Sequence, residues 1–169
     1  MHEIDFTIDR FMDQDCAAAG ELERKVFGED AWSSRDYLES IRLDYVLYLA
    51  VHIKASIEPI GHGSLDFMGS HGSGLIGICG IRNMCGDGNI TNVCVDPTFR
   101  RRGIATAMLN RLMEESREMG VRDFTLEVRH SNIPAIRLYE KMGFKSEGIR
   151  PGFYSHPTED AYIMWKRRQ

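Results

Sequence analysis

The stretch from Asn92 to Thr106 joins a short apolar strand to a proline, three consecutive arginines and a glycine. Pro97 lacks the N–H group that a sheet ladder needs, so the strand should end there, and Gly103 lets the backbone approach a bulky anion where a helix begins. The first N–H groups of that helix have no intrahelical partner, and the helix dipole and the arginines add positive potential. The pattern predicts a binding site for a diphosphate group.

Two common phosphate-binding motifs do not fit this turn. No Gly-Lys-Ser/Thr sequence ends it, which excludes a Walker loop, and only one of the three glycines of a dinucleotide-binding fingerprint is present.

Three further residues downstream could carry chemistry. Glu127 stands inside the apolar strand sequence Leu-Glu-Val, where burial of a charge costs several kcal/mol unless it is solvated or paired. We expect it to face a wet cleft, where a carboxylate can act as a general base, although a strand-end glutamate in solvent is the simpler interpretation. Tyr139 lies on the apolar side of the next helix and could donate a proton from its hydroxyl, or could be an ordinary packed aromatic. Asn132, at the entrance of that helix, is by default a cap.

The order of apolar and polar residues predicts the elements that position these groups. Strands are expected at 4–8, 45–52, 74–82, 89–95, 123–128, 144–149 and 161–166. Helices are expected at 13–27, after a cap at Ser33 or Ser34, from 103 to about 119, and from a cap at Ser131 or Asn132 to Gly143. A Gly-rich excursion is expected at 53–73, and a loop at 150–160.

Length and composition indicate one compact domain spanning residues 1–169, because the chain has 169 residues of which 43% are hydrophobic. The net charge of −4 and the lack of a polybasic run give no indication of a nucleic-acid partner. The N-terminus does not resemble a targeting signal and no apolar run is long enough for a membrane span, so a cytoplasmic location is expected. The four cysteines (Cys16, Cys79, Cys85 and Cys94) match no zinc or redox spacing, and we expect no metal site and no catalytic thiol.

Two sets of residues resemble a known family. The pattern Arg100-x-x-Gly103-x-Ala105, directly after Val-x-Val-x-Pro, resembles the acetyl-coenzyme A signature of the GNAT superfamily of N-acetyltransferases. The segment Leu126 to Phe144, with its Leu-Glu-Val, Ser-Asn, Ala-Ile and Leu-Tyr-Glu pieces, and the Glu-Asp-Ala-x-Ile-Met sequence at 159–164 resemble its RimI-like branch. Members of that branch acetylate the N-terminal alanine of a small-subunit ribosomal protein. Trp32-Ser33 also fits that branch.

The resemblance implies an α/β (α+β) GNAT fold, in which a mixed, mostly antiparallel sheet of six to seven strands is flanked by about four helices and splayed at a cofactor cleft. Acetyl-CoA is the implied cosubstrate. Its pantetheine arm would meet the main chain of Val93, Cys94 and Val95, and its pyrophosphate would lie on Arg100, Arg101, Arg102, Gly103, Ile104, Ala105 and Thr106. Asn132 would contact it near the thioester.

In the implied mechanism an amine attacks the thioester directly in a ternary complex. Glu127 would be the general base, the Val95 N–H would stabilise the oxyanion, and Tyr139 would protonate the leaving thiolate.

The acceptor stays open at this level. The resemblance favours the N-terminal α-amine of a ribosomal or other protein; a small amine, such as a polyamine, amino acid or antibiotic, is the alternative. A non-catalytic acetyl-CoA-binding module is a third interpretation, which the presence of both Glu127 and Tyr139 disfavours. A monomer and a homodimer are both compatible with the sequence.

Overall fold

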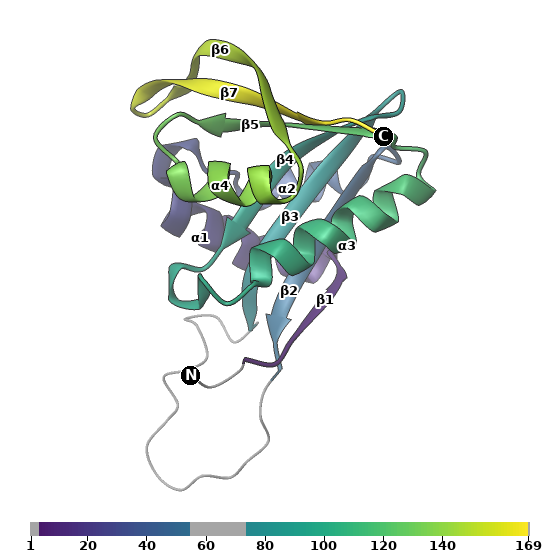
Figure 1. Cartoon of the computed structure of the whole chain (residues 1–169). Coiled ribbons are helices and arrows are strands. Elements are labelled where there is room, and N and C mark those ends of the chain that lie inside the picture. Colours follow the sequence, from purple (N-terminus) through teal and green to yellow (C-terminus); the bar gives the residue numbers. More distant parts are fainter. Residues whose placement is uncertain (1–3, 55–73, 169) are drawn as a thin grey trace, which may run out of the picture.

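The computed structural model describes residues 4–54 and 74–168 as one mixed sheet with helices on both faces (Figure 1). The strands are β1 (Phe6–Arg10), β2 (Val46–Ile53), β3 (Leu75–Met84), β4 (Asp87–Val95), β5 (Asp123–Arg129), β6 (Lys145–Ser155) and β7 (Thr158–Lys166). The α-helices are α1 (Cys16–Phe27), α2 (Ser34–Ser40), α3 (Ile104–Glu118) and α4 (Ile133–Lys141). Short 3₁₀ turns are η1 (Asp13–Asp15), η2 (Gly28–Asp30) and η3 (Pro97–Phe99). Most of the Gly-rich excursion expected at 53–73 falls outside the described residues.

The sheet has the strand order β1-β2-β3-β4-β5-β7-β6. All neighbouring strands are antiparallel except β4 and β5, which are parallel and joined through α3. The seven strands and four α-helices of the described residues confirm the predicted fold class. Within those residues, no helix is both long and apolar enough to cross a bilayer.

Each face of the sheet carries its own core, as the alternation of apolar residues along the strands requires. One core packs α3 and α4 against the sheet and contains Met108, Leu112, Phe124 and Leu126. The other lies under α1 and α2, behind the sheet in Figure 1, and contains Ala19, Tyr37, Tyr48 and Ile78. Residues 124, 126 and 128 of β5 are buried in the first core, so residues 125, 127 and 129 point to the face that carries α1 and α2.

The predicted loop at 150–160 is wrong, because β6 and β7 form one long antiparallel hairpin. Pro151 and Gly152 suggested a loop, but the pairing bulges between Arg150 and Tyr154 and resumes at Tyr154 opposite Glu159. The turn is confined to His156 and Pro157. The turn-forming residues Pro151 and Gly152 therefore do not end β6, because β6 pairs with β7, which follows it in the sequence.

Two smaller predictions from the sequence also change. The nearly continuous apolar sequence at 45–52 predicts a central strand, which is buried along most of its length but is second from the sheet edge, next to β1. The Gly-Asp-Gly sequence at 86–88 predicts a turn, but the turn is made by Cys85 and Gly86, so Asp87 and Gly88 already belong to β4.

The sheet splays between β4 and β5. These strands pair only from Asp87 opposite Asp123 to Ile90 opposite Leu126, although β4 continues to Val95 and β5 to Arg129. The register of β4 against β3 shifts by one residue at Gly80/Ile81, where β4 carries Thr91 as an extra residue. A bulge bends the strand that contains it, so β4 turns away from β5 and leaves a gap.

Candidate active site

The edge of β4 that faces the gap presents main-chain groups of Val93 and Val95. The N–H of Asp96 donates to the Ile76 carbonyl on β3 at 2.9 Å, and N–H groups alternate between the two edges of a strand. Those of Val93 and Val95 therefore point toward the gap. Cys94 turns its N–H to β3, so of the three residues predicted to meet the pantetheine arm only two offer main-chain N–H groups on this edge.

The turn after β4 sets the start of α3. Asp96 accepts a hydrogen bond from the Thr98 N–H at 2.9 Å, and the Nε of Arg100 donates to the Val95 carbonyl at 3.1 Å. Arg101 and Gly103 both have left-handed backbones, with φ of 63° and 79°. This conformation is easy for glycine and costs other residues about 1–2 kcal/mol.

The start of α3 has the local geometry that the predicted cradle requires, and its role in binding stays a prediction. The first intrahelical hydrogen bond joins the Ala107 N–H to the Gly103 carbonyl at 3.0 Å, so the N–H groups of Ile104, Ala105 and Thr106 have no acceptor inside the helix. A Cβ placed on Gly103 would meet nothing within 4 Å, which shows open space above the turn. Arg100, Arg101 and Arg102, which directly precede Gly103, are all exposed. A pyrophosphate fits this combination of free amides, space and positive charge.

Helix α1 is tied to the same turn by an ion pair. The Lys25 ammonium lies 2.9 Å from the Asp96 carboxylate. Partial burial acts to raise the pKa of Asp96, but the hydrogen bonds from Lys25 and Thr98 outweigh it, so this pKa is lowered. Asp96 therefore stays charged and holds the turn.

Glu127 lies on β5 at the gap and faces the α1/α2 side of the sheet, with 18% of its side chain exposed. Its Oε1 is 3.0 Å from a guanidinium nitrogen of Arg150 on β6, and its Oε2 accepts a hydrogen bond from the Asn89 side chain at 3.3 Å. The carboxylate is thus partly solvated and also paired, as the sequence required of a charge at this position.

Tyr139 lies on the opposite face of the sheet. It projects from α4 into the core beneath α3 and α4, and its ring meets Phe144 edge-on at 5.9 Å between centroids. Burial raises the pKa of its phenol, and nearby Tyr154 and Cys79 act in the same direction. No other described residue hydrogen bonds to its hydroxyl. The predicted base and the predicted acid thus lie on opposite faces of the sheet.

Tyr154 is a second phenol at this site, and sequence analysis missed its role because it fell in the predicted loop. Its hydroxyl donates to the main-chain carbonyl of Glu127 at 3.3 Å. The guanidinium of Arg129 lies 4.1 Å from its ring centre. Burial raises the pKa of Tyr154 to about 12, with the positive charge of Arg129 opposing the shift. The sequence carries no alternation of apolar and polar residues that could have revealed β6, because this strand is exposed along most of its length.

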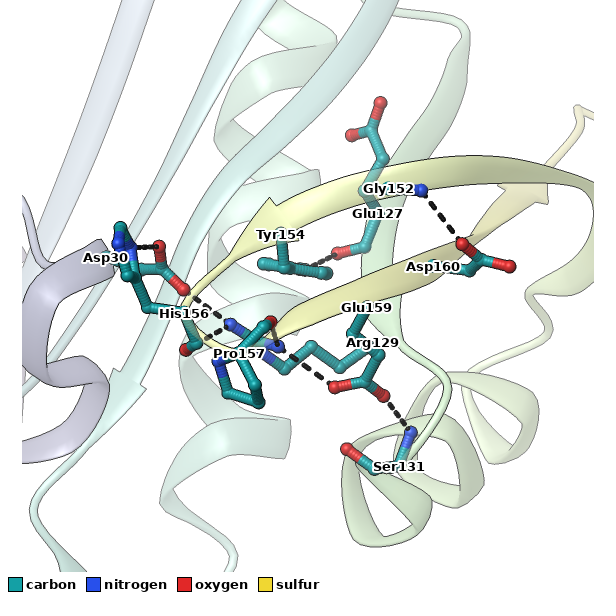
Figure 2. Close-up of polar contacts among 10 residues, drawn as sticks. All are labelled: Asp30, Glu127, Arg129, Ser131, Gly152, Tyr154, His156, Pro157, Glu159 and Asp160. Carbon is teal, nitrogen blue, oxygen red and sulfur yellow. Dashed lines mark hydrogen bonds and ion pairs between the residues drawn. The ribbon is translucent and has the colours of Figure 1, made fainter.

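Arg129 joins the end of β5 to two other segments (Figure 2). One guanidinium nitrogen binds the carboxylate of Glu159 on β7 at 2.9 Å, and the other binds that of Asp30 in η2. The same side chain donates to the carbonyls of His156 and Pro157 at 2.9 and 3.1 Å. The η2 turn before α2 and the tip of the β6–β7 hairpin are thereby held together beside the gap.

The remaining predicted residues have structural partners. Asn132 caps α4, as expected, by accepting a hydrogen bond from the Ala135 N–H at 3.3 Å. Ser33 caps α2 in a reciprocal arrangement with Asp36. Trp32 packs on Tyr37 and lies under Arg82.

Three of the four cysteines are buried, and burial raises the pKa of all three thiols (Cys16, Cys79 and Cys94). A raised thiol pKa leaves little thiolate at neutral pH, so these residues are poor nucleophiles.

Comparison with known proteins agrees with this geometry. Residues 27–144 match the family model described as the acetyltransferase (GNAT) family. A Bacillus subtilis (strain 168) protein, provisionally named a ribosomal protein bS18-alanine N-acetyltransferase, is 33% identical over 86% of this chain and 84% of its own length. The ribosomal protein bS18-alanine N-acetyltransferase of Escherichia coli (strain K12) is 43% identical over 82 residues, which are 46% of this chain and 54% of that protein.

A solved structure extends the likeness to the fold. The crystal structure of the ribosomal-protein-S18-alanine N-acetyltransferase from Escherichia coli superposes with a TM-score of 0.75 at 26% identity, over 96% of this chain and 94% of that one. Because the family model covers most of the chain and the Bacillus relative nearly all of it, this protein belongs to the GNAT family and is an N-acetyltransferase.

Proposed function

We propose that this enzyme transfers the acetyl group of acetyl-CoA to the N-terminal α-amine of a protein that begins with alanine, as the names of its relatives state for bS18. The observation that carries the proposal is the gap between β4 and β5, which has a carboxylate on one face of the sheet and a buried phenol on the other. An amine can reach one side of the gap while the thioester lies along the other.

The residues that would hold acetyl-CoA form a continuous track. The main-chain groups of Val93 and Val95 would pair with the pantetheine arm as an added strand does, and the amides of 104–106 with the neighbouring arginines would bind the pyrophosphate. Asn132 stands at the mouth of α4, next to where the arm would end. When bound, acetyl-CoA supplies the thioester that is attacked.

Glu127 would prepare the acceptor. An α-amine is largely protonated at neutral pH, since its ordinary pKa is about 7.7–8.0, and it must lose a proton to become a nucleophile. Glu127 takes that proton, directly or through water, and Arg150 holds the carboxylate in place. The nitrogen then forms a bond to the acetyl carbon, and the carbonyl electrons move to oxygen.

Two donors would act on the attacked thioester. The Val95 N–H donates to the developing oxyanion, and the oxyanion collapses as the carbon–sulfur bond breaks. Tyr139 donates to the leaving sulfur. Because burial raises the pKa of this phenol, Tyr139 keeps a proton and stabilises the thiolate by a hydrogen bond. As the intermediate collapses, the attacking nitrogen loses its second proton, and this proton balances the one that sulfur receives through Tyr139. No covalent intermediate on the enzyme is needed.

The acceptor would enter beside the bridge that Arg129 makes between η2 and the β6–β7 hairpin. The wall at this entrance includes two main-chain carbonyls and two carboxylates, all already paired with Arg129 (Figure 2). A peptide, which carries main-chain donors and acceptors of its own, suits such a wall better than a small polyamine does.

The test is an acetylation assay with purified enzyme, acetyl-CoA and four acceptors: a hexapeptide that begins with alanine, the same peptide with a blocked N-terminus, a peptide whose only free amine is a lysine side chain, and spermidine. Acetylation confined to the free α-amine, seen by thiol release and mass spectrometry, is the expected result. Acetylation of spermidine alone would contradict the peptide assignment and move the enzyme to the small-amine branch. Binding of CoA without turnover on any acceptor would favour the interpretation as a non-catalytic acetyl-CoA-binding module.

A further inference from the structure

A second hollow, of about 910 Å³, lies at the far end of α3 from the phosphate cradle. Four elements contribute its walls: the end of α3, the start of β5, the end of α4 and the end of β7, near the C-terminus in Figure 1. Its cationic lining residues are Arg117, Arg122, Lys141, Lys166, Arg167 and Arg168. Thirteen residues of α3 separate Arg117 from Ile104, which is about 20 Å at 1.5 Å per residue, so the hollow is separate from the acetyl-transfer site.

Six cations line this basic hollow, and they outnumber the three carboxylates that act on Arg167, which are Glu147, Asp123 and Asp87. Among the described residues, only Arg167 of the six forms an ion pair, with Glu147 at 2.8 Å. Asp123 is engaged by the main-chain N–H of Arg168 at 2.6 Å. The whole chain has a net charge of −4, so such a cluster on one end is a local departure from the rest of the molecule.

Two of the cations that line the hollow, Arg117 and Lys166, are near enough for the charge of Arg117 to act on Lys166. The guanidinium of Arg117 is 5.3 Å from the ring centre of the buried Phe124 and donates to the Met113 carbonyl at 3.4 Å. Partial burial lowers the pKa of Lys166, and the charge of Arg117 lowers it further. Two neighbouring cations repel each other, and partial burial removes part of their hydration. An anion bound between them would offset both the repulsion and the lost hydration.

We propose that the basic hollow binds the phosphate backbone of RNA. Four of its six cations are arginines, whose planar guanidinium groups match phosphate oxygens with two parallel hydrogen bonds. Their spread over four elements suits a chain of phosphates better than a single anion. The choice of RNA over an acidic peptide rests on the proposed function, because bS18, the substrate named for the relatives, is a ribosomal protein. The net charge of −4 for the whole chain did not indicate a nucleic-acid partner.

The first test is binding of a fluorescent single-stranded RNA, measured by anisotropy with CoA in excess to occupy the cradle formed by residues 100–106. We expect the logarithm of the association constant to fall linearly with the logarithm of the salt concentration, with a slope of about −0.7 for each phosphate contacted. Polyglutamate and ATP serve as competitors. Competition by polyglutamate at the same concentration as RNA would indicate an acidic protein partner, and competition by ATP at equal strength would indicate a free nucleotide; either result overturns the proposal.

Two double variants with the same change in net charge locate the site. Arg122→Glu with Lys141→Glu alters the hollow, and Arg24→Glu with Arg42→Glu alters exposed cations on and after the helices of the other face. The first pair should weaken RNA binding by at least about tenfold and make the salt slope shallower by about 0.7 for each phosphate that is no longer bound, whereas the second should change both far less. Equal losses of affinity in both variants would show that only net charge matters and would overturn the proposal.

Acetylation of the alanine peptide is measured in the same preparations. Both variants should keep the wild-type rate and a cooperative thermal unfolding transition, because neither touches the gap. Failure of the wild-type enzyme to acetylate the peptide would count against the proposed function and would remove the reason for choosing RNA over an acidic peptide. Failure of RNA to bind, with acetylation intact, counts against this inference alone.

Discussion

The carboxylate of Glu127 lies where β4 and β5 separate. It forms an ion pair with Arg150 and accepts a hydrogen bond from the Asn89 side chain. Its replacement by glutamine keeps the size and the hydrogen-bonding capacity of the side chain but removes the base. We expect Glu127→Gln to lower kcat by about 10²–10⁴-fold, the usual contribution of general acid–base catalysis, with little change in CoA affinity. Steady-state kinetics and calorimetry check this. Glu114→Gln, on the exposed side of α3, is the matched control. A Glu127→Gln enzyme with wild-type turnover would falsify the assignment.

The two tyrosines near the gap have separable roles. Tyr139→Phe removes a buried hydroxyl that makes no hydrogen bond to another described residue, so folding should be little affected, while kcat should fall by about 10²-fold. Tyr154→Phe removes the hydrogen bond to the Glu127 carbonyl, which should cost about 1 kcal/mol of stability and only a small part of kcat. Urea unfolding and acetylation kinetics on both variants distinguish them. The reverse ranking of kcat would make Tyr154 the proton donor.

Glu23 on α1 is a buried carboxylate that the proposed chemistry does not use. It is 1% exposed and accepts hydrogen bonds from the Tyr37 hydroxyl at 2.8 Å and the Asn92 side chain at 3.2 Å. Burial raises its pKa, and these hydrogen bonds oppose the shift. Because the folded pKa lies above the unfolded one, the stabilising contribution is complete below the unfolded value, near pH 4.3, and is lost as pH rises through the folded value.

Glu23→Gln should remove this pH dependence. Urea unfolding at several pH values between 4 and 8 gives the free energy of unfolding of the variant minus that of wild type. This difference should rise with pH, by up to about 1.4 kcal/mol for each unit by which folding raises the pKa of Glu23. Rotation of the Asn92 amide, whose Oδ1 is buried without a partner among the described residues, can accept the new N–H group. Glu23→Ala instead leaves donors unpaired and should cost about 3 kcal/mol. If the difference in the free energy of unfolding between Glu23→Gln and wild type does not vary with pH, the titration of Glu23 does not cause the pH dependence of stability.

At the scale of elements, the start and the end of α3 provide a matched comparison. Gly103 precedes the helix with φ of 79°, Gly120 follows it with φ of 87°, and a Cβ on either would meet nothing within 4 Å. Gly103→Ala and Gly120→Ala should therefore both cost about 1–2 kcal/mol through backbone strain alone. Only Gly103→Ala should also weaken CoA binding, because only it alters the cradle. Thermal unfolding and calorimetric titration with CoA test this, and equal CoA affinities in the two variants would argue against the cradle.

The β6–β7 hairpin is the second element on which the site depends. It supplies Arg150 to Glu127, Tyr154 to the main chain of β5, and Glu159 to Arg129. The Ser131 N–H, and after it Arg129, lower the pKa of Glu159. The interaction between Glu159 and Arg129 is therefore complete above the ordinary pKa of a glutamate, and it is lost as the pH falls through the lowered pKa of Glu159. The hairpin thus joins Glu127, the proposed base, to the proposed acceptor side of the gap.

For the whole molecule, the sheet places the cradle and the basic hollow at opposite ends of α3, and ligands of the two sites should bind independently. CoA at 100 times its dissociation constant should stabilise the folded protein by about 2.7 kcal/mol, which raises the melting temperature by roughly 5–10 °C in a chain of this size. The shift should be the same in the double variant at Arg122 and Lys141. Differential scanning fluorimetry measures it, and a reduced shift in that variant would mean that the two ends are coupled.

The sequence alone was sufficient for the features that are built from one contiguous run. The cradle uses only residues 92–106, and a strand end, a glycine and the first amides of a helix are local properties of the chain. Alternation and helical periodicity likewise predicted nearly every element, because each reflects one buried face. The resemblance in residues 126–144 identified the candidate base and acid, and their chemical roles stay predictions.

The tertiary structure alone decided what depends on pairing across the chain. Residues 150–155 carry loop signals, yet they form a strand because β7 offers its hydrogen-bonding edge. Glu23 resembles a surface helix charge in the sequence, but Asn92, 69 residues away, encloses it with α2. The basic hollow collects residues from 117 to 168 that are scattered among acidic ones in the sequence. Burial and electrostatic potential depend on distances in space, and separation along the chain does not encode those distances.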